Sequence, residues 1–374
     1  MTAHASSPSH VHRFMREEWF LPIVALSGLA FMFLDETLFA ALSKPFGFAF
    51  IFIWLFASVL GAALCVVRHA DHLAEQLGEP YGTLILTLTI TSIEVIAISA
   101  VMIHGGNNPT LARDTLLAVI MIILNGMVGL SLLIGGWRRR EQSHNMQGAN
   151  AYLGVIVPLA TLDLILPSFL PSDGSQASGM SQMILGVVSF VLYGIFLMLQ
   201  AGRHQHFFAE EGGLLTETER TTARSSILLH SLLLLAYMAP VVFLVEKLAV
   251  PVDYVIETVH APAALGGIIM AVLVATPEAI SAVRASIANR LQRAVNISLG
   301  SVLSTIAITV PAMLFIGHIN QHQLTLGLTG SDLVMLIVTL AVSIITFASG
   351  RTHVMQGAVH LVLFLAYALL IFQQ

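Results

Sequence analysis

The fold is decided by the stretch Gly266–Pro311, which reads GGIIMAVLVATPEAISAVRASIANRLQRAVNISLGSVLSTIAITVP. Its first half is an apolar run with a single carboxylate, Glu278, near the middle. A charged side chain at the centre of a bilayer costs at least about 2.5 kcal/mol, so such a residue indicates a functional site. Pro277 precedes the carboxylate and removes a backbone donor, which predicts a kinked or broken helix with freed carbonyls at that point.

A second stretch has the same design earlier in the chain. Gly82–Ala100 reads GTLILTLTITSIEVIAISA and carries one carboxylate, Glu94, with Thr91 at helical spacing before it. In both copies a glycine opens an apolar run with a central Glu, and a span with buried amides or hydroxyls follows. Sequence identity between the copies is slight, so an internal repeat rests on this pattern and on the topology.

The composition is that of a polytopic membrane protein. Of 374 residues, 56% are hydrophobic and only 10% are charged, and the mean hydropathy is +0.86. No segment between the apolar runs is long enough for a soluble domain, so residues 19–374 are expected to form one membrane domain after a cytosolic tail, 1–18. The charged pair Glu17 and Glu18 before the first apolar run argues against a removable signal peptide. With one cysteine, Cys65, an intramolecular disulfide is impossible.

Windows of about 20 apolar residues predict about eleven transmembrane helices in an all-α fold. They are Trp19–Leu34, Phe48–Val67, Thr83–Ile103, Thr115–Gly136, Ala151–Leu170, Met183–Ala201, Ile227–Leu248, Pro262–Val283, Val295–Ile316, Leu333–Ala348 and Val354–Phe372. Asp35 and Glu36 cut the first of these short.

The distribution of Lys and Arg predicts the orientation. With the N-terminus in the cytoplasm, 13 of the 16 basic residues fall on the inside, and only Lys44, Arg113 and Lys247 fall outside. The C-terminus is then outside. The Glu94 span runs outward and the Glu278 span inward, so 45–202 and 227–374 are predicted to be inverted five-helix repeats, with one extra N-terminal helix and a cytosolic linker, 203–226. The charged linker is either a cytosolic cation sensor or a solvated connection.

Catalytic motifs are missing. The sequence contains no HExxH, GxxxxGK[ST], GxSxG or CxxC, so metalloprotease, ATPase, serine hydrolase and thiol-redox activities have no support. No cofactor and no nucleic-acid partner are expected; the partners are the lipid bilayer and the transported ions. Any transport must use an ion gradient. A channel shares the inverted plan, but two facing carboxylates without a ring of subunits favour an alternating-access site.

The two carboxylates suggest a cation site that also takes protons. Burial disfavours the charged form, so an empty site holds protons, whereas a bound cation reverses the preference. Together Glu94 and Glu278 supply a charge of −2, matched by one Ca²⁺ or by two protons, and hard oxygen ligands suit Ca²⁺ or Na⁺. The alternative is that each Glu is a protonated carboxyl hydrogen-bonded between helices.

Other polar residues are candidates for the same site. Possible co-ligands or site walls are Thr91, Asn125, Pro277, Asn296, Gly300, Ser301, Ser304 and Thr305. Small polar residues also hold membrane helices together, so both roles remain open for them. Asp163 is either a water-exposed cavity wall or part of a proton path, and His360 is either a packing residue or a proton relay.

The chain resembles the ChaA-type branch of the calcium/cation antiporter superfamily over almost its whole length. The resemblance rests on LGEPYGTLILTLTITSIEV at Leu77, PTLARDTLLAVIMIILNG at Pro109, GLSLLIGG at Gly129, ATPEAISAVRASIANRLQRAVNISLGSVLSTIAITVP at Ala275 and GRTHVMQGAVHLVLFLAY at Gly350. It implies a ten-helix core of inverted repeats plus an extra helix, with Glu94 and Glu278 as the ion-binding and proton-exchanging carboxylates. Two features depart from the family: Thr91 and Ala275 stand where an Asn precedes each Glu, and the acidic cytosolic tract is short.

The sequence therefore predicts a secondary antiporter of the bacterial inner membrane. We expect it to extrude Ca²⁺, and also Na⁺ or K⁺, from the cytoplasm in exchange for protons. One alternative is a purely monovalent Na⁺(K⁺)/H⁺ antiporter. A remote alternative is an intramembrane enzyme that uses Glu94 and Glu278 as acid and base, for which no nucleophile or metal motif is present.

Overall fold

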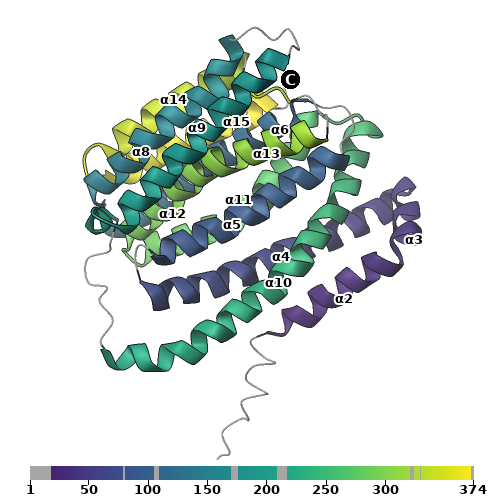
Figure 1. The fold of residues 1–374 in the computed structure, drawn as a ribbon, viewed down its shortest axis with the longest axis horizontal. Coiled ribbons are helices and arrows are strands. Elements are labelled where there is room, and N and C mark those ends of the chain that lie inside the picture. The colour runs from purple at the N-terminus through teal and green to yellow at the C-terminus, as the bar shows by residue number, and fades with distance from the viewer. Residues whose placement is uncertain are drawn as a thin grey trace, which may run out of the picture.

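The computed structural model describes residues 18–78, 81–104, 109–169, 176–208, 217–320, 324–328 and 330–371, so nearly all of the predicted N-terminal tail lies outside the described residues. The structure is an all-helical bundle, which confirms the predicted fold class (Figure 1). The α-helices are α2 (Phe20–Phe33), α3 (Asp35–Phe39), α4 (Pro45–Leu77), α5 (Tyr81–His104), α6 (Leu111–Met121), α7 (Val128–Arg139), α8 (Met146–Ala160), α9 (Gln176–Ala201), α10 (Glu217–Glu257), α11 (Ala263–Ile287), α12 (Leu291–Ser304), α13 (Val310–Ile319), α14 (Gly330–Phe347) and α15 (Val354–Ile371).

Hydropathy and length together identify the membrane-crossing helices. Within the described ranges, nine helices are long and apolar enough to span a bilayer, and a tenth span results if a bent pair is counted as one. In α5 the apolar part, Leu84–Ala100, is shorter. The chain is thus a multi-pass membrane protein, while the count of eleven spans stays a prediction.

The bent pair is the predicted first span. It consists of α2 and the segment Asp35–Ser43, which includes α3 and the 3-10 turn η1 (Ala40–Ser43) and lies at 84° to α2. The apolar helix ends where Asp35 and Glu36 begin α3, because charged side chains leave the apolar region. Asp35 Oδ2 pairs with Lys247 Nζ of α10 at 3.0 Å. The peripheral segment is thereby attached to the bundle.

A long helix occupies part of the predicted linker. α10 begins at Glu217 and packs along α4 (Figure 1), so the last part of 203–226 is helical, while its assignment as a cytosolic linker stays a prediction. The apolar pattern of this helix starts only at Ile227, which is why a hydropathy window places its start too late. Residues 209–216 lie outside the described part of the chain. Hence neither proposed role of the linker is tested.

Irregular turns interrupt three central helices. π-Helical turns join α6 to α7 at η2 (Ile122–Met127), follow α8 at η3 (Thr161–Ile165) and join α12 to α13 at η6 (Thr305–Thr309). Such turns are rare and are frequent at functional sites. In contrast, α11 is continuous through Pro277, so the helix is not broken at Glu278. One missing hydrogen bond is tolerated because neighbouring helices hold α11 in place.

Loops predicted to share a side of the membrane do meet. Strands β1 (Glu141–Ser143) and β2 (Arg351–His353) pair antiparallel, and Gln142 Nε2 donates to Ser286 O at the end of α11 at 2.9 Å. On the opposite side, Thr325 N donates to Pro109 O at 2.9 Å. The relative sidedness of these loops agrees with the charge pattern. The 3-10 turns η4 (Leu166–Phe169) and η5 (Gln205–Phe207) complete the connections.

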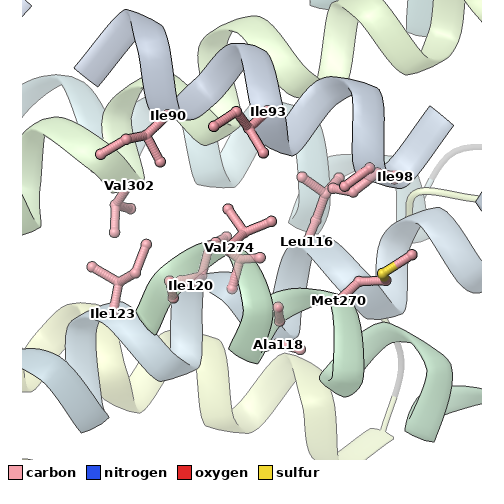
Figure 2. Close-up of a cluster of buried hydrophobic side chains, with 14 of the residues drawn as sticks. Ile90, Ile93, Ile98, Leu116, Ala118, Ile120, Ile123, Met270, Val274 and Val302 are labelled. Atoms are coloured by element: carbon pink, nitrogen blue, oxygen red, sulfur yellow. The ribbon is translucent and has the colours of Figure 1, made fainter. Parts of the chain in front are cut away.

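The buried core extends through most helices of the bundle, and one cluster of it is formed by apolar side chains from α5, α6, η2, α11 and α12 (Figure 2). Ile90 and Ile93 of α5 lie opposite Val302 of α12 and Val274 of α11, and all four are almost fully buried. Ile90 precedes Glu94 by four residues, and Val274 precedes Glu278 by four residues, which is about one helical turn in each case. The carboxylates therefore lie in a part of the molecule from which apolar packing excludes water.

Candidate functional site

Glu94 lies on α5 with only 2% of its surface exposed. Its Oε2 accepts a hydrogen bond from Thr305 Oγ1 in η6 at 2.7 Å. Its Oε1 completes no hydrogen bond with any described residue. A buried carboxylate oxygen without a donor is costly, so this atom has capacity for a proton or a cation.

Glu278 lies on α11 and is also 2% exposed. Its Oε2 accepts a hydrogen bond from Ser301 Oγ in α12 at 2.5 Å. Ser301 and Thr305 are four residues apart, one helical turn, so the same stretch of chain holds both carboxylates. The two carboxylates are bonded to hydroxyls that stand one helical turn apart. The structure thus brings the two predicted carboxylates into one site.

A chain of hydroxyls extends the site on the α5–α12 interface. Thr91 Oγ1 donates to Ser304 Oγ at 2.7 Å, and Ser304 Oγ donates to Ser301 O at 2.9 Å. Four of the predicted co-ligands, Thr91, Ser301, Ser304 and Thr305, are therefore gathered around the carboxylates. Pro277 lies beside Glu278 on the continuous helix α11.

The site contains no compensating cation from the protein. Among the described residues, neither Glu94 nor Glu278 forms an ion pair with a Lys, Arg or His. If both carboxyls were ionised, two buried negative charges would repel each other in a medium of low dielectric constant. The site is stable only with protons or with a bound cation.

A small cavity lies one helical turn from the hydroxyl chain. Gly300 borders it opposite Thr87, the residue one turn before Thr91 on α5. Gln200 Nε2 donates to Tyr152 OH at 2.9 Å across the far wall. The cavity lies toward the start of α5, which is the predicted cytoplasmic end of that helix. Thr87 was not among the predicted site residues, although it precedes Thr91 at helical spacing.

Asn125 is not at the carboxylates. Its Nδ2 donates to Thr339 Oγ1 at 2.8 Å, and its Oδ1 lies 3.2 Å from His360 Nδ1. The other ring nitrogen of His360, Nε2, lies 3.0 Å from Thr346 Oγ1. A neutral imidazole with its proton on Nδ1 satisfies every one of these contacts. The structure supports a packing role for Asn125 and His360, and it does not support a co-ligand role for Asn125.

The side-chain amide of Asn296 also forms its hydrogen bonds away from the two carboxylates. Its Nδ2 donates to Phe208 O at 2.7 Å, and its Oδ1 accepts from Gln292 Nε2 at 2.8 Å. The Nδ2 bond joins the segment after α9 to α12, whereas the Oδ1 bond stays within α12. Asn296, predicted as a possible co-ligand, therefore fixes the segment around Phe208 against α12.

Asp163 lies in η3 and is 2% exposed, so the prediction of a water-exposed cavity wall was wrong. The carboxyl faces Ser189 of α9, and its Oδ2 completes no hydrogen bond with any described residue. Hydropathy places Asp163 inside a span but cannot tell which way its side chain points. The structure directs it into the bundle, away from lipid.

Comparisons with known proteins agree with this architecture. The family described as sodium/calcium exchanger protein matches residues 47–202 and again 229–373. The chain is 41% identical over 313 residues to the y4hA protein of Sinorhizobium fredii, covering 83% of this chain and 85% of that one. It is 38% identical over 319 residues to the sodium-potassium/proton antiporter ChaA of Escherichia coli, covering 84% of this chain and 86% of that one.

Two solved structures share the fold. Native YfkE superposes with a TM-score of 0.74 at 18% identity and covers 95% of this chain and 100% of its own. The H⁺/Ca²⁺ exchanger CAX has a TM-score of 0.68 at 14% identity, covering 95% of this chain and 89% of its own. The two structures show the fold. The family model, whose two matched segments cover most of the sequence, establishes the family. The chain belongs to the sodium/calcium exchanger protein family.

Proposed function

We propose that the protein is a secondary antiporter that moves Ca²⁺, and also Na⁺ or K⁺, out of the cytoplasm in exchange for protons. The observation that carries the proposal is the pair of buried carboxylates, Glu94 and Glu278, held by hydroxyls of one helix without a cationic neighbour. The names of relatives support the ion classes: the E. coli relative is a sodium-potassium/proton antiporter, and a Bacillus subtilis relative is a Ca²⁺/H⁺ antiporter.

Exchange follows from the charge balance of the site. Two protons or one Ca²⁺ neutralise the two carboxylates. Protons and cation exclude each other because they bind the same carboxylate oxygens. The hydroxyls of Ser301 and Thr305 donate to the carboxylates in the proton-loaded state and turn their oxygens toward the ion in the cation-loaded state. Glu94 Oε1, which has no donor among the described residues, is the first oxygen available to either load.

A purely monovalent Na⁺(K⁺)/H⁺ antiporter is the second candidate. The relative from E. coli, at 38% identity, is named for sodium and potassium. With one Na⁺ bound, the second carboxyl keeps a proton, so a charge of −2 is compatible with this cycle as well. The choice between divalent and monovalent cargo is therefore a matter for transport assays.

Alternating access is proposed to come from two inverted repeats, 45–202 and 227–374. The double family match, at 47–202 and 229–373, supports this division. Glu94 of the first repeat is bonded to Thr305 of the second, so relative motion of the repeats would change the site directly. The cavity at Thr87 and Gly300 is then the cytoplasmic approach to the site. In this proposal the protein lies in the bacterial inner membrane with its N-terminus inside and its C-terminus outside, as the distribution of Lys and Arg predicts.

The proposal is tested in everted membrane vesicles with an imposed pH gradient. Addition of Ca²⁺, Na⁺ or K⁺ should release protons from the vesicle interior in the wild type. Glu94→Gln and Glu278→Gln should each abolish this exchange, since the amide keeps shape and hydrogen bonding but cannot carry a proton. Glu246→Gln, at an exposed position of α10, is the matched control. Wild-type exchange in either correctly folded Gln variant would exclude that Glu from the mechanism.

A further inference from the structure

A second group of buried polar residues lies outside the site described above. Asp163 of η3, Ser189 of α9 and Thr309 of η6, here called the Asp163 cluster, are exposed by 2%, 0% and 0%. Asp163 Oδ2, Ser189 Oγ and Thr309 Oγ1 each complete no hydrogen bond with any described residue. Because more than about nine in ten buried polar groups in proteins are hydrogen-bonded, three such oxygens require an explanation.

The packing of α9 brings the three residues together. The Asp163 carboxyl faces Ser189, and α9 contacts both η3 and η6. Gly186 of α9 lies against Pro311, whereas Tyr193, further along α9, lines the same cavity as Leu303. The helix therefore runs antiparallel to the segment α12–η6–α13. Ser189 and Thr309 both lie between these two contacts along their segments.

The charge of Asp163 has no protein partner. Among the described residues, it forms no ion pair with any Lys, Arg or His, and the two nearby hydroxyls carry no charge. An ionised carboxylate in this position would be an uncompensated buried charge, which proteins avoid. It needs a proton or a metal cation. A proton on Asp163 can donate one hydrogen bond, so it can reach only one of the two hydroxyl oxygens.

Spacing favours the metal cation. Oxygens that surround a hard cation each lie about 2.4 Å from it and hence stand further from one another than hydrogen-bonded oxygens do. Oxygens that share a burial site yet form no hydrogen bonds with each other fit that arrangement. One carboxylate supplies a charge of −1, which one monovalent ion neutralises, whereas a divalent ion would leave an excess positive charge in the bundle.

In the first half of the chain, the residue at the same spacing from its Glu as Thr309 is hydrogen-bonded to other side chains. Asn125 follows Glu94 by 31 residues, and Thr309 follows Glu278 by the same 31. Asn125 is fully bonded by Thr339 and by His360. Thr309 Oγ1, in contrast, completes no hydrogen bond with any described residue. The hydroxyl oxygen of Thr309 is therefore available to coordinate an ion.

We propose that the Asp163 cluster binds one monovalent metal cation, with Asp163, Ser189 and Thr309 as ligands, at a site separate from Glu94 and Glu278. This proposal is independent of the transport function proposed above. Its probe is Na⁺, with choline at equal ionic strength as the reference. The site is measured on the purified full-length chain in which both transport carboxylates are replaced, Glu94→Gln together with Glu278→Gln.

In that double variant, NaCl should raise the thermal unfolding temperature in a saturable way relative to choline chloride, because an ion that binds only the folded state stabilises it. Asp163→Asn, added to the same background, should remove the difference between the two salts. Ser189→Ala and Thr309→Val should each raise the half-saturating Na⁺ concentration by about tenfold, the loss expected for one contact to a charged group. Thr161→Ala, an exposed hydroxyl in the same turn, should leave it unchanged.

Two results would overturn the proposal. One is an unfolding temperature of the double variant that is equal in NaCl and in choline chloride. The other is an Na⁺-dependent shift that survives Asp163→Asn. If Asp163→Asn does not yield folded protein, the hydroxyl variants decide, and an unchanged half-saturating concentration in both of them rejects the site. Loss of proton exchange in vesicles with an intact Na⁺ shift would reject the transport proposal alone.

Discussion

Thr305 of η6 donates its hydroxyl to Glu94 Oε2 of α5 at 2.7 Å, across 211 positions of sequence. One helical turn earlier, Ser301 bonds Glu278 in the same way. A single helix surface thus holds a carboxylate from α5 and another from α11. A movement of this helix surface would change the hydrogen bonds of both carboxylates at the same time. Coupled exchange of two protons for one cation requires such a joint response.

Thr305→Val should weaken cation binding. Valine keeps the shape of threonine but leaves Glu94 without a hydrogen-bond donor among the described residues, and a hydrogen bond to a charged group contributes enough for a loss of about ten- to hundredfold in apparent affinity. The concentration of Ca²⁺ or Na⁺ that gives half-maximal proton release in vesicles measures the effect. Thr276→Val is the control, because the Thr276 hydroxyl donates to the Val272 carbonyl of its own helix and to no other residue in the described part of the chain. Equal affinities in both variants would show that Thr305 has no part in the site.

His360→Phe should reduce stability and leave ion affinity intact. The substitution leaves Asn125 Oδ1 and Thr346 Oγ1 without their shared partner, and an unsatisfied buried polar group costs about 1–3 kcal/mol. Thermal unfolding of the purified protein measures the loss, and vesicle exchange measures affinity. The opposite pattern, unchanged stability with abolished exchange, would place His360 in a proton path.

Topology is testable with single cysteines in a Cys65→Ser background. Ser143, in β1, is predicted to lie inside, and Asn320, after α13, is predicted to lie outside; both are exposed. In intact cells a membrane-impermeant thiol reagent should label Asn320→Cys and leave Ser143→Cys unlabelled. Labelling of Ser143→Cys alone would reverse the orientation, and labelling of both would contradict the inverted repeats.

His144 should make stability sensitive to acid. It lies between β1 and α8, outside the spans, with its Nε2 at 3.3 Å from Phe347 O. Burial lowers the pKa of the His144 imidazole below its ordinary value of 6.5, because the charged form is poorly solvated there. The unfolded chain therefore binds this proton more readily, so the stability from neutral His144 is complete above about pH 6.5 and decreases as pH falls. His144→Gln should flatten the pH dependence of the unfolding temperature below that value, whereas His353→Gln, at an exposed position, should not.

The predictable part of this molecule is the part that local sequence determines. An isolated Glu in an apolar run marks a buried carboxylate regardless of its neighbours, so Glu94 and Glu278 were identified without coordinates. Ser301 and Thr305 could be predicted as possible co-ligands because they lie one helical turn apart on the same face of a helix. Asn125 was different, since its direction depends on how η2 is packed against α14 and α15, which no local pattern contains.

The remaining differences also come from packing. Pro277 predicts a break, but neighbouring helices keep α11 continuous. The π-helical turns were not foreseen, because their sequences are ordinary helix-forming apolar runs. The sequence does carry one signal for Thr309, which stands in the same position relative to Glu278 as Asn125 does relative to Glu94.

Competition between protons and the cation is the most direct test of the shared site. Both carboxyls are buried and near each other, so a proton that leaves before a cation arrives leaves an uncompensated charge. Protons hold the site in acid, and the cation gains access as pH rises, so apparent cation affinity must increase with pH on the cation-binding side. The two groups titrate as a pair, and only macroscopic values for the pair are observable.

The measurement uses proteoliposomes with a fixed internal pH and a series of external pH values, and it records half-saturating cation concentration at each. The affinity should rise toward alkaline pH and level off once both protons have left the empty site. Asp163→Asn serves as the comparison for a buried carboxylate outside the pair, and the rise should persist in it. In a Glu94→Gln or Glu278→Gln variant with residual cation binding, one titrating group is lost and the dependence should become shallower. An affinity in the wild type that is the same at acid and alkaline pH would mean that protons and cation bind at different places, and the shared site would have to be abandoned.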